Sequence, residues 1–494
     1  MSTEITKIGI IQTSPLPGDF SNNLRAVVNG YRECIEHGAE LVIAPACSIC
    51  GLEPGHLVLR RSFISQTKKC LNTLSKELGT VPLLLAAYTR TYDEDAASVG
   101  IVEDDNDYDS WGGKELDVLL TPFLVENGCI TELEATESMT LGSQRFYIDT
   151  TEVDFMMEKD YDFIICLSEL PWYTTAADDA HYLFDWATND TGATLICCRP
   201  VGTAGSNLYG GGSCVYSPEG KMIMRMPYFE TCAQVVDLKR PKPVLNPPEP
   251  AELLCSALQR GIRDTVRNNC FGGVCIPLDH KNSALLAALC VEALGSSMVC
   301  GITFSGNDTL AEKLGISCYK PNLDKMLEAA TGTMGQEHEA ALRERLCTTV
   351  AMTYAESRGL LLCSPIDHQE IMLGNFQTYG LSGGYLAPLG NLYTIDIFVC
   401  SSVMKETYPD IIGAIVPPSD DTTDRIIHEL MDKNVAASAM LNPETNYLFK
   451  ENKVRSVQRK ILMSAMKRTQ LPLTLNISPK ASQHYFPVSH RLND

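Results

Sequence analysis

Positive charge is scarce in this chain. Its 494 residues include 40 lysines and arginines against 61 aspartates and glutamates, which gives a formal net charge of −21. Proteins that bind nucleic acid or anionic membranes do so through clustered cations that meet negative phosphates. The composition therefore argues against both kinds of partner, and we expect neither nucleic acid nor membrane to bind.

Long apolar segments are also missing. The chain has no run of about 18 apolar residues, the length that suggests a membrane-spanning helix. The first residues, MSTEITKIGIIQTSP, have neither the basic start nor the long apolar core of a secretory signal. We therefore expect a cytoplasmic protein.

Cysteine is abundant, but the pattern of a metal site is missing. Most of the 19 cysteines stand within apolar runs, and without a secretion signal we expect them to be reduced core residues. Cys47 and Cys50 form the only C-x-x-C motif, and no second pair of cysteines or histidines completes a zinc-binding set. The sequence therefore predicts no metal site.

The chain is too long for one ordinary core, so two or three domains are expected. In the first half, short apolar strands alternate with amphipathic helices, which is typical of a layered α/β domain. Strands are expected at residues 7–12, 41–44, 82–88, 160–167 and 194–199. Helices are expected from an N-cap at Asn22 or Asn23 to Gly38, at 63–78 and around 181–187, and the acidic stretch 103–109 predicts a solvated hairpin tip.

A proline-rich stretch separates two α/β patterns. Residues 240–250, RPKPVLNPPEP, contain five prolines in eleven residues, so they form neither a helix nor a central strand. We expect one domain at residues 1–239, a linker at 240–250 and a second domain at 251–494. In the second domain we expect helices at 251–266, 283–294, 309–314 and 337–358, with strands at 273–276, 297–303 and 360–363.

The second domain is organised around the strand, loop and helix of residues 273–294. Free N–H groups at the start of a helix attract anions, so this arrangement is typical of a phosphate-binding loop. Asn282 and Ser283 are suitable N-cap residues, and Gly295 is a suitable stop. The loop itself has no glycine to let a phosphate approach, and Asp279 adds a negative charge. The scaffold of an anion site is present, but the site itself is predicted to be filled.

Both halves resemble the glutamine-dependent NAD synthetase family. The first half is similar to its nitrilase-type glutaminase domain through KIGIIQTSPLPGDFSNNL, GAELVIAPACSICGLEPGHLVLRRSF and LYGGGSCVYSPEGK. The second half is similar to its synthetase domain through ALQRGIRDTVRNN, NSALLAALCVEALGS, LGNFQTYGLSGGYLAPLGNLYT and MKRTQLPLTLNISPKASQHYFPVSHRL. The resemblance implies a four-layer α-β-β-α nitrilase-like sandwich, followed by a Rossmann-like parallel-sheet domain of the adenine nucleotide α-hydrolase type.

The resemblance implies a Glu-Lys-Cys glutaminase triad, and this chain departs from it at each position. The base should follow Pro45, where Ala46 stands, and no lysine occurs between Lys114 and Lys159. The stretch 146–149 reads FYID in place of Ile-Cys-Glu-Asp, so the nucleophile is missing. Cys166 belongs to the next strand, where the family usually has asparagine, and it is expected to be a core residue rather than the nucleophile.

The synthetase motifs are altered in the same way. The family's Ser-Gly-Gly-x-Asp-Ser loop aligns with Leu278, Asp279, His280, Lys281, Asn282 and Ser283, in which only the last serine is kept. Lys281 is expected either to touch a phosphate or to be solvated. The segment 365–370 keeps only Glu370 of Thr-Gly-Asn-Lys-Ser-Glu, and His368 is expected to be a surface or hydrogen-bonded histidine.

Other family segments are changed or kept. Both lysines of a later Lys-Asp-x-x-Lys segment are missing at 390–394, and the loop that closes over ATP is reduced to 305–308. Pro417, Pro418 and Ser419 remain.

Losses on chemical residues with retained core patterns favour a pseudoenzyme, a structural scaffold that forms a homo-oligomer or joins a larger assembly. Two alternatives remain: a nucleotide or dinucleotide sensor, and a divergent NAD synthetase that uses ammonia or glutamine. We predict no catalytic residue, no metal and no cofactor; ATP and Mg²⁺ are expected only if binding or activity is retained.

Overall fold

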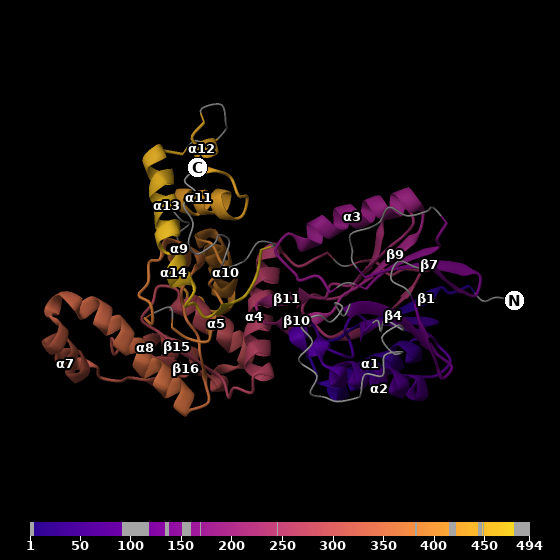
Figure 1. Ribbon diagram of the computed structural model, residues 1–494, viewed down its shortest axis with the longest axis horizontal. Helices are drawn as coiled ribbons and strands as arrows, with labels where there is room; N and C mark the ends of the chain where they lie inside the picture. Colours follow the sequence, from indigo (N-terminus) through magenta and orange to yellow (C-terminus); the bar gives the residue numbers. More distant parts are fainter. Residues whose placement is uncertain are drawn as a thin grey trace, which may run out of the picture. The chain divides into compact units, whose positions relative to one another are not determined.

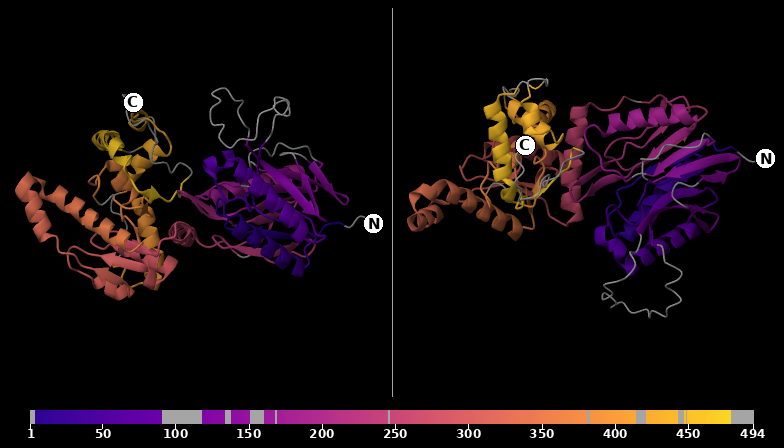
Figure 2. Two further views of the ribbon diagram at one scale, coloured as in Figure 1. Left: turned by 60° about the horizontal axis from the view of Figure 1, so that its bottom comes forward. Right: turned by 45° about the horizontal axis from the view of Figure 1, so that its top comes forward.

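The computed structural model describes residues 4–90, 118–133, 138–150, 160–167, 169–244, 246–380, 383–413, 421–442, 447 and 449–478 (Figures 1 and 2). The chain divides into two compact units. The first comprises Met1–Pro171, Ala176–Ala204 and Tyr209–Pro247, and the second comprises Trp172–Thr175, Gly205–Leu208 and Pro248–Asp494. The acidic stretch 103–109 and the segment 417–419 lie outside the described residues.

The first unit is built on strands and three long helices. Its strands, with β11 extending from the second unit, are β1 (Lys7–Gln12), β2 (Leu41–Ile43), β3 (Leu83–Arg90), β4 (Val118–Glu126), β5 (Cys129–Glu132), β6 (Ser138–Leu141), β7 (Gln144–Asp149), β8 (Phe163–Leu167), β9 (Thr194–Cys198), β10 (Val201–Ala204), β11 (Asn207–Gly210), β12 (Cys214–Tyr216), β13 (Met222–Arg225) and β14 (Cys232–Asp237). Its helices are α1 (Phe20–Glu36), η1 (Gly55–Leu59), α2 (Arg61–Glu77) and α3 (Ala176–Thr191).

Two six-stranded sheets face each other in the described part of this unit. Their strand orders are β14-β1-β2-β3-β4-β5 and β13-β12-β9-β8-β7-β6, and the central strands β1–β2–β3 and β7–β8–β9 are parallel. Residues from both sheets form one core, which includes Ile10, Val42, Ile148 and Ile165. Figure 1 shows α1 and α2 on one side of the paired sheets and α3 on the other. The predicted four-layer α-β-β-α sandwich is confirmed.

The first helix starts earlier than the sequence predicted. Its N-cap is Asp19, whose carboxylate accepts a hydrogen bond from the Asn22 N–H at 3.4 Å. Asn23 is buried instead, and its side-chain amide exchanges hydrogen bonds of 2.8 and 3.0 Å with the backbone of Leu16. The predicted cap at Asn22 or Asn23 is therefore wrong, because a carboxylate and an asparagine both fit a cap and only the path of the preceding loop decides between them.

The second unit is rich in helices. Its strands are β15 (Val274–Pro277), β16 (Val299–Ile302), β17 (Ser317–Tyr319), β18 (Leu361–Leu362), β19 (Leu386–Ala387) and β20 (Leu473–Thr474). Its helices are α4 (Pro250–Asn268), α5 (Ser283–Leu294), η3 (Ser296–Met298), α6 (Thr309–Leu314), α7 (Asp324–Met334), η4 (Gln336–His338), α8 (Glu339–Ser357), α9 (His368–Leu373), α10 (Thr394–Thr407), α11 (Thr422–Met431), α12 (Ala437–Met440), α13 (Glu451–Met463) and α14 (Ala465–Arg468).

A four-stranded parallel sheet forms the base of this unit. Its strand order is β17-β16-β15-β18, and all its pairs are parallel, as the predicted Rossmann-like domain requires. A second core joins α9, α11 and α13 through residues such as Ile371, Ile427 and Val457. In Figure 1 these helices gather on one side of β15 and β16.

Helix α5 is central because it carries the loop that the sequence singled out. Its side chains are buried around most of its circumference, among them Leu285, Leu289 and Cys290. It ends at Gly295, which adopts φ 85°, a conformation that glycine reaches without a steric penalty. The predicted stop is confirmed. Asn282 occupies the N-cap position, but its side chain makes no cap hydrogen bond and is free to bond elsewhere.

Candidate functional site

The loop of residues 278–282 joins β15 to α5 at the carboxyl end of a parallel sheet, where ligands bind in open α/β folds. Asp279 is exposed there, but its carboxylate is already hydrogen-bonded. Its carboxylate accepts hydrogen bonds from the Thr303 hydroxyl at 2.7 Å, the Ser305 hydroxyl at 2.6 Å and the Phe304 N–H at 2.6 Å. Asp279 therefore fastens this loop to the segment that follows β16.

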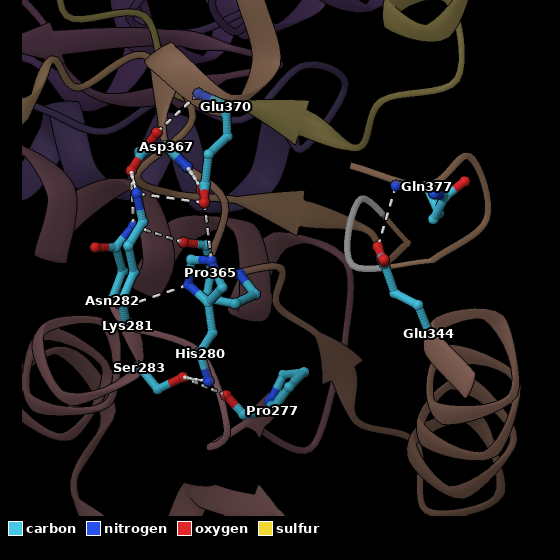
Figure 3. A network of polar contacts seen from close by, with 10 residues as sticks. All are labelled: Pro277, His280, Lys281, Asn282, Ser283, Glu344, Pro365, Asp367, Glu370 and Gln377. Atoms are coloured by element: carbon cyan, nitrogen blue, oxygen red, sulfur yellow. Dashed lines mark hydrogen bonds and ion pairs between the residues drawn. The ribbon is translucent and has the colours of Figure 1, made fainter. Parts of the chain in front are cut away.

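The two basic side chains of the loop are paired with two carboxylates. Lys281 Nζ lies 2.7 Å from Asp367 Oδ2 and 3.3 Å from Glu370 Oε1. His280 accepts the Asn282 N–H at Nδ1, so Nε2 carries the proton and donates to Glu370 Oε1 at 3.1 Å. Figure 3 shows these side chains pointing toward one another, with the contact between Glu344 and Gln377 lying apart from them.

Asp367 and Glu370 are held in place by the helix that they start. Asp367 is the N-cap of α9 and accepts the Glu370 N–H at 2.9 Å, while the Glu370 side chain accepts the Asp367 N–H at 3.0 Å. This reciprocal capping box holds both carboxylates in position through contacts that do not involve the loop. Asp367 is nearly buried, with 5% of its side chain exposed, whereas Lys281 is 57% exposed.

The charged groups of this network shift each other's pKa values in favour of the ionised forms. Burial by itself would raise the pKa of Glu370, but the hydrogen bond from His280 and the charge of Lys281 outweigh it and lower the pKa. Burial by itself would lower the pKa of Lys281, but Asp367 and Glu370 raise it above its usual value. Lys281 and Glu370 are therefore both ionised near neutral pH, and the charge of Lys281 is neutralised by its carboxylate partners.

The remaining loop residues bond to the protein's own backbone. Asn282 Nδ2 donates to the Pro365 carbonyl at 3.2 Å and to Asp367 Oδ2 at 3.1 Å. The Ser283 hydroxyl donates to the Pro277 carbonyl at 2.7 Å and accepts the His280 N–H at 3.2 Å. Leu278 turns inward, with 9% of its surface exposed. All six residues that the sequence singled out are thus brought together and bonded to the protein itself.

His368 lies close to this network but is not at the surface. It is buried, its Nδ1 lies 3.3 Å from the Gly390 carbonyl oxygen, and its ring packs edge-on against Tyr393 at 4.7 Å between centroids. Burial lowers the pKa of His368, so the ring is neutral near pH 7. The expectation of a surface histidine is wrong, and the hydrogen-bonded alternative describes its Nδ1.

A second polar cluster lies in the first unit, after β2. Ala46 is fully buried there and offers no base. The next residue, Cys47, adopts φ 58°, which is uncommon for a residue with a side chain, and its thiol donates to Glu169 Oε2 at 3.0 Å. The Tyr88 hydroxyl donates to the other oxygen of Glu169 at 2.7 Å. Sequence reasoning missed this cluster.

The acid–base state of Cys47 follows from its surroundings. Burial first, then the thiol of Cys50 and the carboxylate of Glu169, raise the pKa of Cys47 well above its usual value. Burial also raises the pKa of Tyr88. Cys47 is therefore a neutral thiol near pH 7, which is a poor nucleophile until its proton is removed.

The positions expected for a nucleophile carry none. In β7, the family's cysteine aligns with Tyr147, which is buried in a cluster with Ile164 and Phe184. Cys166 in β8 is buried among Ile164, Phe184 and Leu195, as predicted for a core residue. Among the described residues, no group of three or more histidine, cysteine or acidic side chains is placed to hold a metal ion. In the same residues, no helix is long and apolar enough to cross a bilayer.

Comparison with known proteins gives one consistent result. Residues 254–470 match the family model described as NAD synthase. Over 96% of this chain and 96% of its own length, a glutamine-dependent NAD(+) synthetase of Synechocystis is 22% identical, and one from Thermotoga maritima is 23% identical over 99% of both chains. An NH(3)-dependent NAD(+) synthetase of Finegoldia magna is 31% identical over 32% of this chain and 70% of its own length.

Solved structures agree on the fold. A glutamine-dependent NAD(+) synthetase from Cytophaga hutchinsonii superimposes with a TM-score of 0.79 at 15% identity, over 98% of both chains. A glutamine-dependent NAD+ synthetase from Acinetobacter baumannii, solved in complex with adenosine diphosphate, has a TM-score of 0.72 at 16% identity, also over 98% of both chains.

Proposed function

Because this chain belongs to the glutamine-dependent NAD synthetase family, we propose that it keeps the family's fold as a structural scaffold and catalyses neither of the family's two reactions. As a pseudoenzyme it acts through its surfaces, either as a homo-oligomer or as a component of a larger assembly.

The observation that carries this proposal is the network between the β15–α5 loop and α9. A phosphate-binding loop needs unengaged N–H groups and an unmatched cation. Here His280 and Lys281 meet the carboxylates of Asp367 and Glu370 at 2.7–3.3 Å. A triphosphate would have to displace these carboxylates and would meet their charge in a partly buried site.

The metal position also fits poorly with Mg·ATP. The family's metal-facing aspartate is replaced by Asn282, which donates its amide protons to Pro365 and Asp367. An amide that donates at this point offers no anionic oxygen to a hard cation. We therefore derive no reaction step through ATP or Mg²⁺ for this chain.

The first unit supports the same conclusion for glutamine hydrolysis. Ala46 supplies no base, and Cys47 is a protonated thiol covered by Glu169. Removal of one member of a catalytic triad typically costs several orders of magnitude in rate.

A scaffold needs a surface on which to assemble, and α3 offers one. Tyr182 is 79% exposed and Trp186, one turn later on the same helix, is 46% exposed. Large aromatic side chains dominate protein interfaces because they bury much apolar area at small entropic cost. Light scattering of the purified protein, with Y182S/W186S as the comparison, should show a smaller assembly for the double variant if α3 contributes to it.

Calorimetric titration tests the loss of ATP binding. The full chain is titrated with Mg·ATP and with deamido-NAD, the same sample is assayed for NAD, and the Thermotoga maritima enzyme serves as the positive control. We expect no heat of binding and no product. Binding without product would identify a nucleotide sensor, and NAD formation near ordinary enzyme turnover would refute the proposal.

A restored loop sharpens this test. The variant L278S/D279G/H280G/N282D rebuilds the family's Ser-Gly-Gly-x-Asp-Ser pattern on the existing Lys281 and Ser283. If this variant binds Mg·ATP and the natural chain does not, the loss lies in the loop. If neither binds, the carboxylates of Asp367 and Glu370 also block the site. Adding D367A/E370Q to the restored loop should then allow Mg·ATP to bind.

A further inference from the structure

The C-x-x-C motif of the first unit folds into a tight turn. The Cys50 N–H donates to the Cys47 carbonyl at 3.2 Å, and the Gly51 N–H donates to the same oxygen at 2.8 Å. A turn closed by such a bond brings its first and fourth Cα atoms within about 7 Å. A disulfide spans about 4.4–6.8 Å between Cα atoms, so the backbone already holds the two cysteines at a suitable separation.

The second cysteine of the motif lies close to the first. The Cys50 side chain turns back toward Cys47, since its thiol lies 3.8 Å from the Cys47 carbonyl oxygen. Both residues are fully buried and both thiols are free in this structure. A bond between them needs little backbone movement, because the turn already exists.

A carboxylate lies next to one of the thiols. Glu169 Oε2 accepts the Cys47 thiol at 3.0 Å and is itself partly exposed to solvent. The raised pKa of Cys47 makes the thiol unreactive while it stays protonated. Glu169 is therefore positioned to accept that proton, and its partly exposed carboxylate lies in contact with the buried thiol.

A further polar group in the turn has no assigned role. The Ser48 hydroxyl is fully buried and has no hydrogen-bond partner among the described residues. Buried hydroxyls are normally hydrogen-bonded, so this one is an unusual feature of the segment that carries the two cysteines.

We propose that Cys47 and Cys50 form a redox-active dithiol that hydrogen peroxide converts to an intramolecular disulfide. In the first step Glu169 takes the Cys47 thiol proton, the Cys47 sulfur attacks one peroxide oxygen, the O–O bond breaks, and Glu169 returns the proton to the leaving hydroxide, which departs as water. Cys47 is now a sulfenic acid. In the second step the Cys50 sulfur attacks the Cys47 sulfur, the S–O bond breaks, and the Cys50 thiol proton passes to the departing hydroxide, which leaves as a second water. Two thiols and one peroxide thus give one disulfide and two waters, and a small dithiol reverses the change.

This inference does not depend on the scaffold proposal. It requires only the geometry of the turn and Glu169, and it would hold for an active synthetase as well.

Site-resolved thiol labelling of the full chain tests it. The protein is exposed to hydrogen peroxide, free thiols are blocked in denaturant, and reversibly oxidised cysteines are then reduced and labelled with a second reagent for mass spectrometry. The exposed Cys129 and Cys270 report that the oxidant is active, and the buried Cys70 is the matched control without a thiol partner in a turn. We expect Cys47 and Cys50 to oxidise together, in equal amounts, and to recover with dithiothreitol.

Single variants separate the steps. In C50S, Cys47 cannot form the disulfide, so its sulfenic acid should be trapped by dimedone. E169Q keeps a hydrogen-bond acceptor but cannot take a proton, and since a positioned base typically contributes a large factor, we expect oxidation about tenfold slower than in the natural chain.

Three outcomes would overturn the inference. In the first, Cys47 and Cys50 stay reduced while Cys129 is oxidised. In the second, Cys47 and Cys50 oxidise no faster than Cys70. In the third, C50S gives no trapped sulfenic acid although its thermal unfolding matches that of the natural chain. Should C50S fail to fold, C50A provides the same test with a smaller apolar side chain.

Discussion

The loop after β2 and the loop after β15 occupy the same kind of position, the carboxyl end of a strand with parallel neighbours, yet they satisfy their polar groups differently. After β15, a lysine ammonium and a histidine N–H meet two carboxylates. After β2, the carboxylate of Glu169 accepts hydrogen bonds from two neutral donors, a thiol and a phenol. The first arrangement pairs a charged amine with carboxylates, whereas the second places a thiol and a phenol on one carboxylate. The same kind of position in a sheet thus carries an ion-pair network in one unit and a network of neutral donors in the other.

The largest effect should come from breaking the turn after β2. Gly51 adopts φ +100°, and an added Cβ would lie 2.2 Å from the Pro17 Cα. Because the contact is with backbone, G51A should cost more than about 4 kcal/mol or prevent folding. Gly55 is the control, since it has φ +51° but nothing within 4 Å of a new Cβ. G55A should cost about 1 kcal/mol from backbone strain alone, measured by urea unfolding. Equal costs for the two variants would show that the turn is not held as described.

Removing Asp367 should break the closed loop after β15. D367A leaves Lys281 and Asn282 without their shared acceptor and α9 without its cap. We expect the free energy of unfolding to fall by about 2 kcal/mol, since the variant removes a helix cap and an acceptor of the buried Asn282 amide, whereas the exposed Lys281 is resolvated. The matched control is K320A, whose partner Asp308 lies at the surface, and it should cost less than about 1 kcal/mol. A small effect of D367A would mean that the network contributes little to holding the loop.

Two carboxyls of the second unit should respond to pH in opposite directions. Burial raises the pKa of Asp396 to about 6, so the unfolded chain releases this proton first and stability falls as pH rises from about 4 to 6. A shift of about 2 pKa units corresponds to about 3 kcal/mol. The pKa of Glu370 is lowered, so its contribution is lost as pH falls through the acidic range. Urea unfolding at several pH values should show that D396N removes the first slope and E370Q the second; unchanged slopes would contradict the assignment.

The smallest expected effect on stability is the difference between removing the hydroxyl of Tyr88 and removing that of Tyr209, two tyrosines of the first unit. The Tyr88 hydroxyl donates to the partly exposed Glu169, so Y88F should cost about 1 kcal/mol, a typical value for one hydrogen bond to a carboxylate near the surface. The Tyr209 hydroxyl donates to the exposed Glu53 at 2.5 Å, and Y209F should cost less, about 0.5 kcal/mol, because water replaces the lost donor. Thermal unfolding can rank the two, and the reverse order would argue against Glu169 as the centre of its cluster.

Much of the fold was predictable because local patterns carried it. The strand at 7–12 and the helix at 309–314 were predicted with the bounds that the structure shows, and Gly295 ends its helix as predicted. Alternating apolar strands and amphipathic helices predicted both α/β units. Helix α10 was not predicted, because its apolar residues are spread around the helix and show no amphipathic pattern. Helices α11 and α13 were missed although their sequences are amphipathic.

The candidate sites were only half predictable. The sequence identified the loop 278–283 as a filled anion site, because a glycine-free loop with an aspartate disfavours phosphate. It did not identify what fills the loop, although the D-x-x-E pattern of residues 367–370 was a readable capping signal. Glu370 was noted only as a family remnant, and Asp367 was not noted as a partner of Lys281.

The sequence by itself determined the family, the layered α/β architecture and the acidic charge, since each of these depends on residue type and local order. Only the tertiary structure decided which groups meet. Cys47 and Glu169 are separated by 122 positions, and Asn282 and Asp367 by 85. Hydrogen bonds and ion pairs act over about 3 Å, so contacts between such distant positions exist only after the sheets have assembled. The protonated thiol beside a carboxylate and the neutralised loop are therefore properties of the fold.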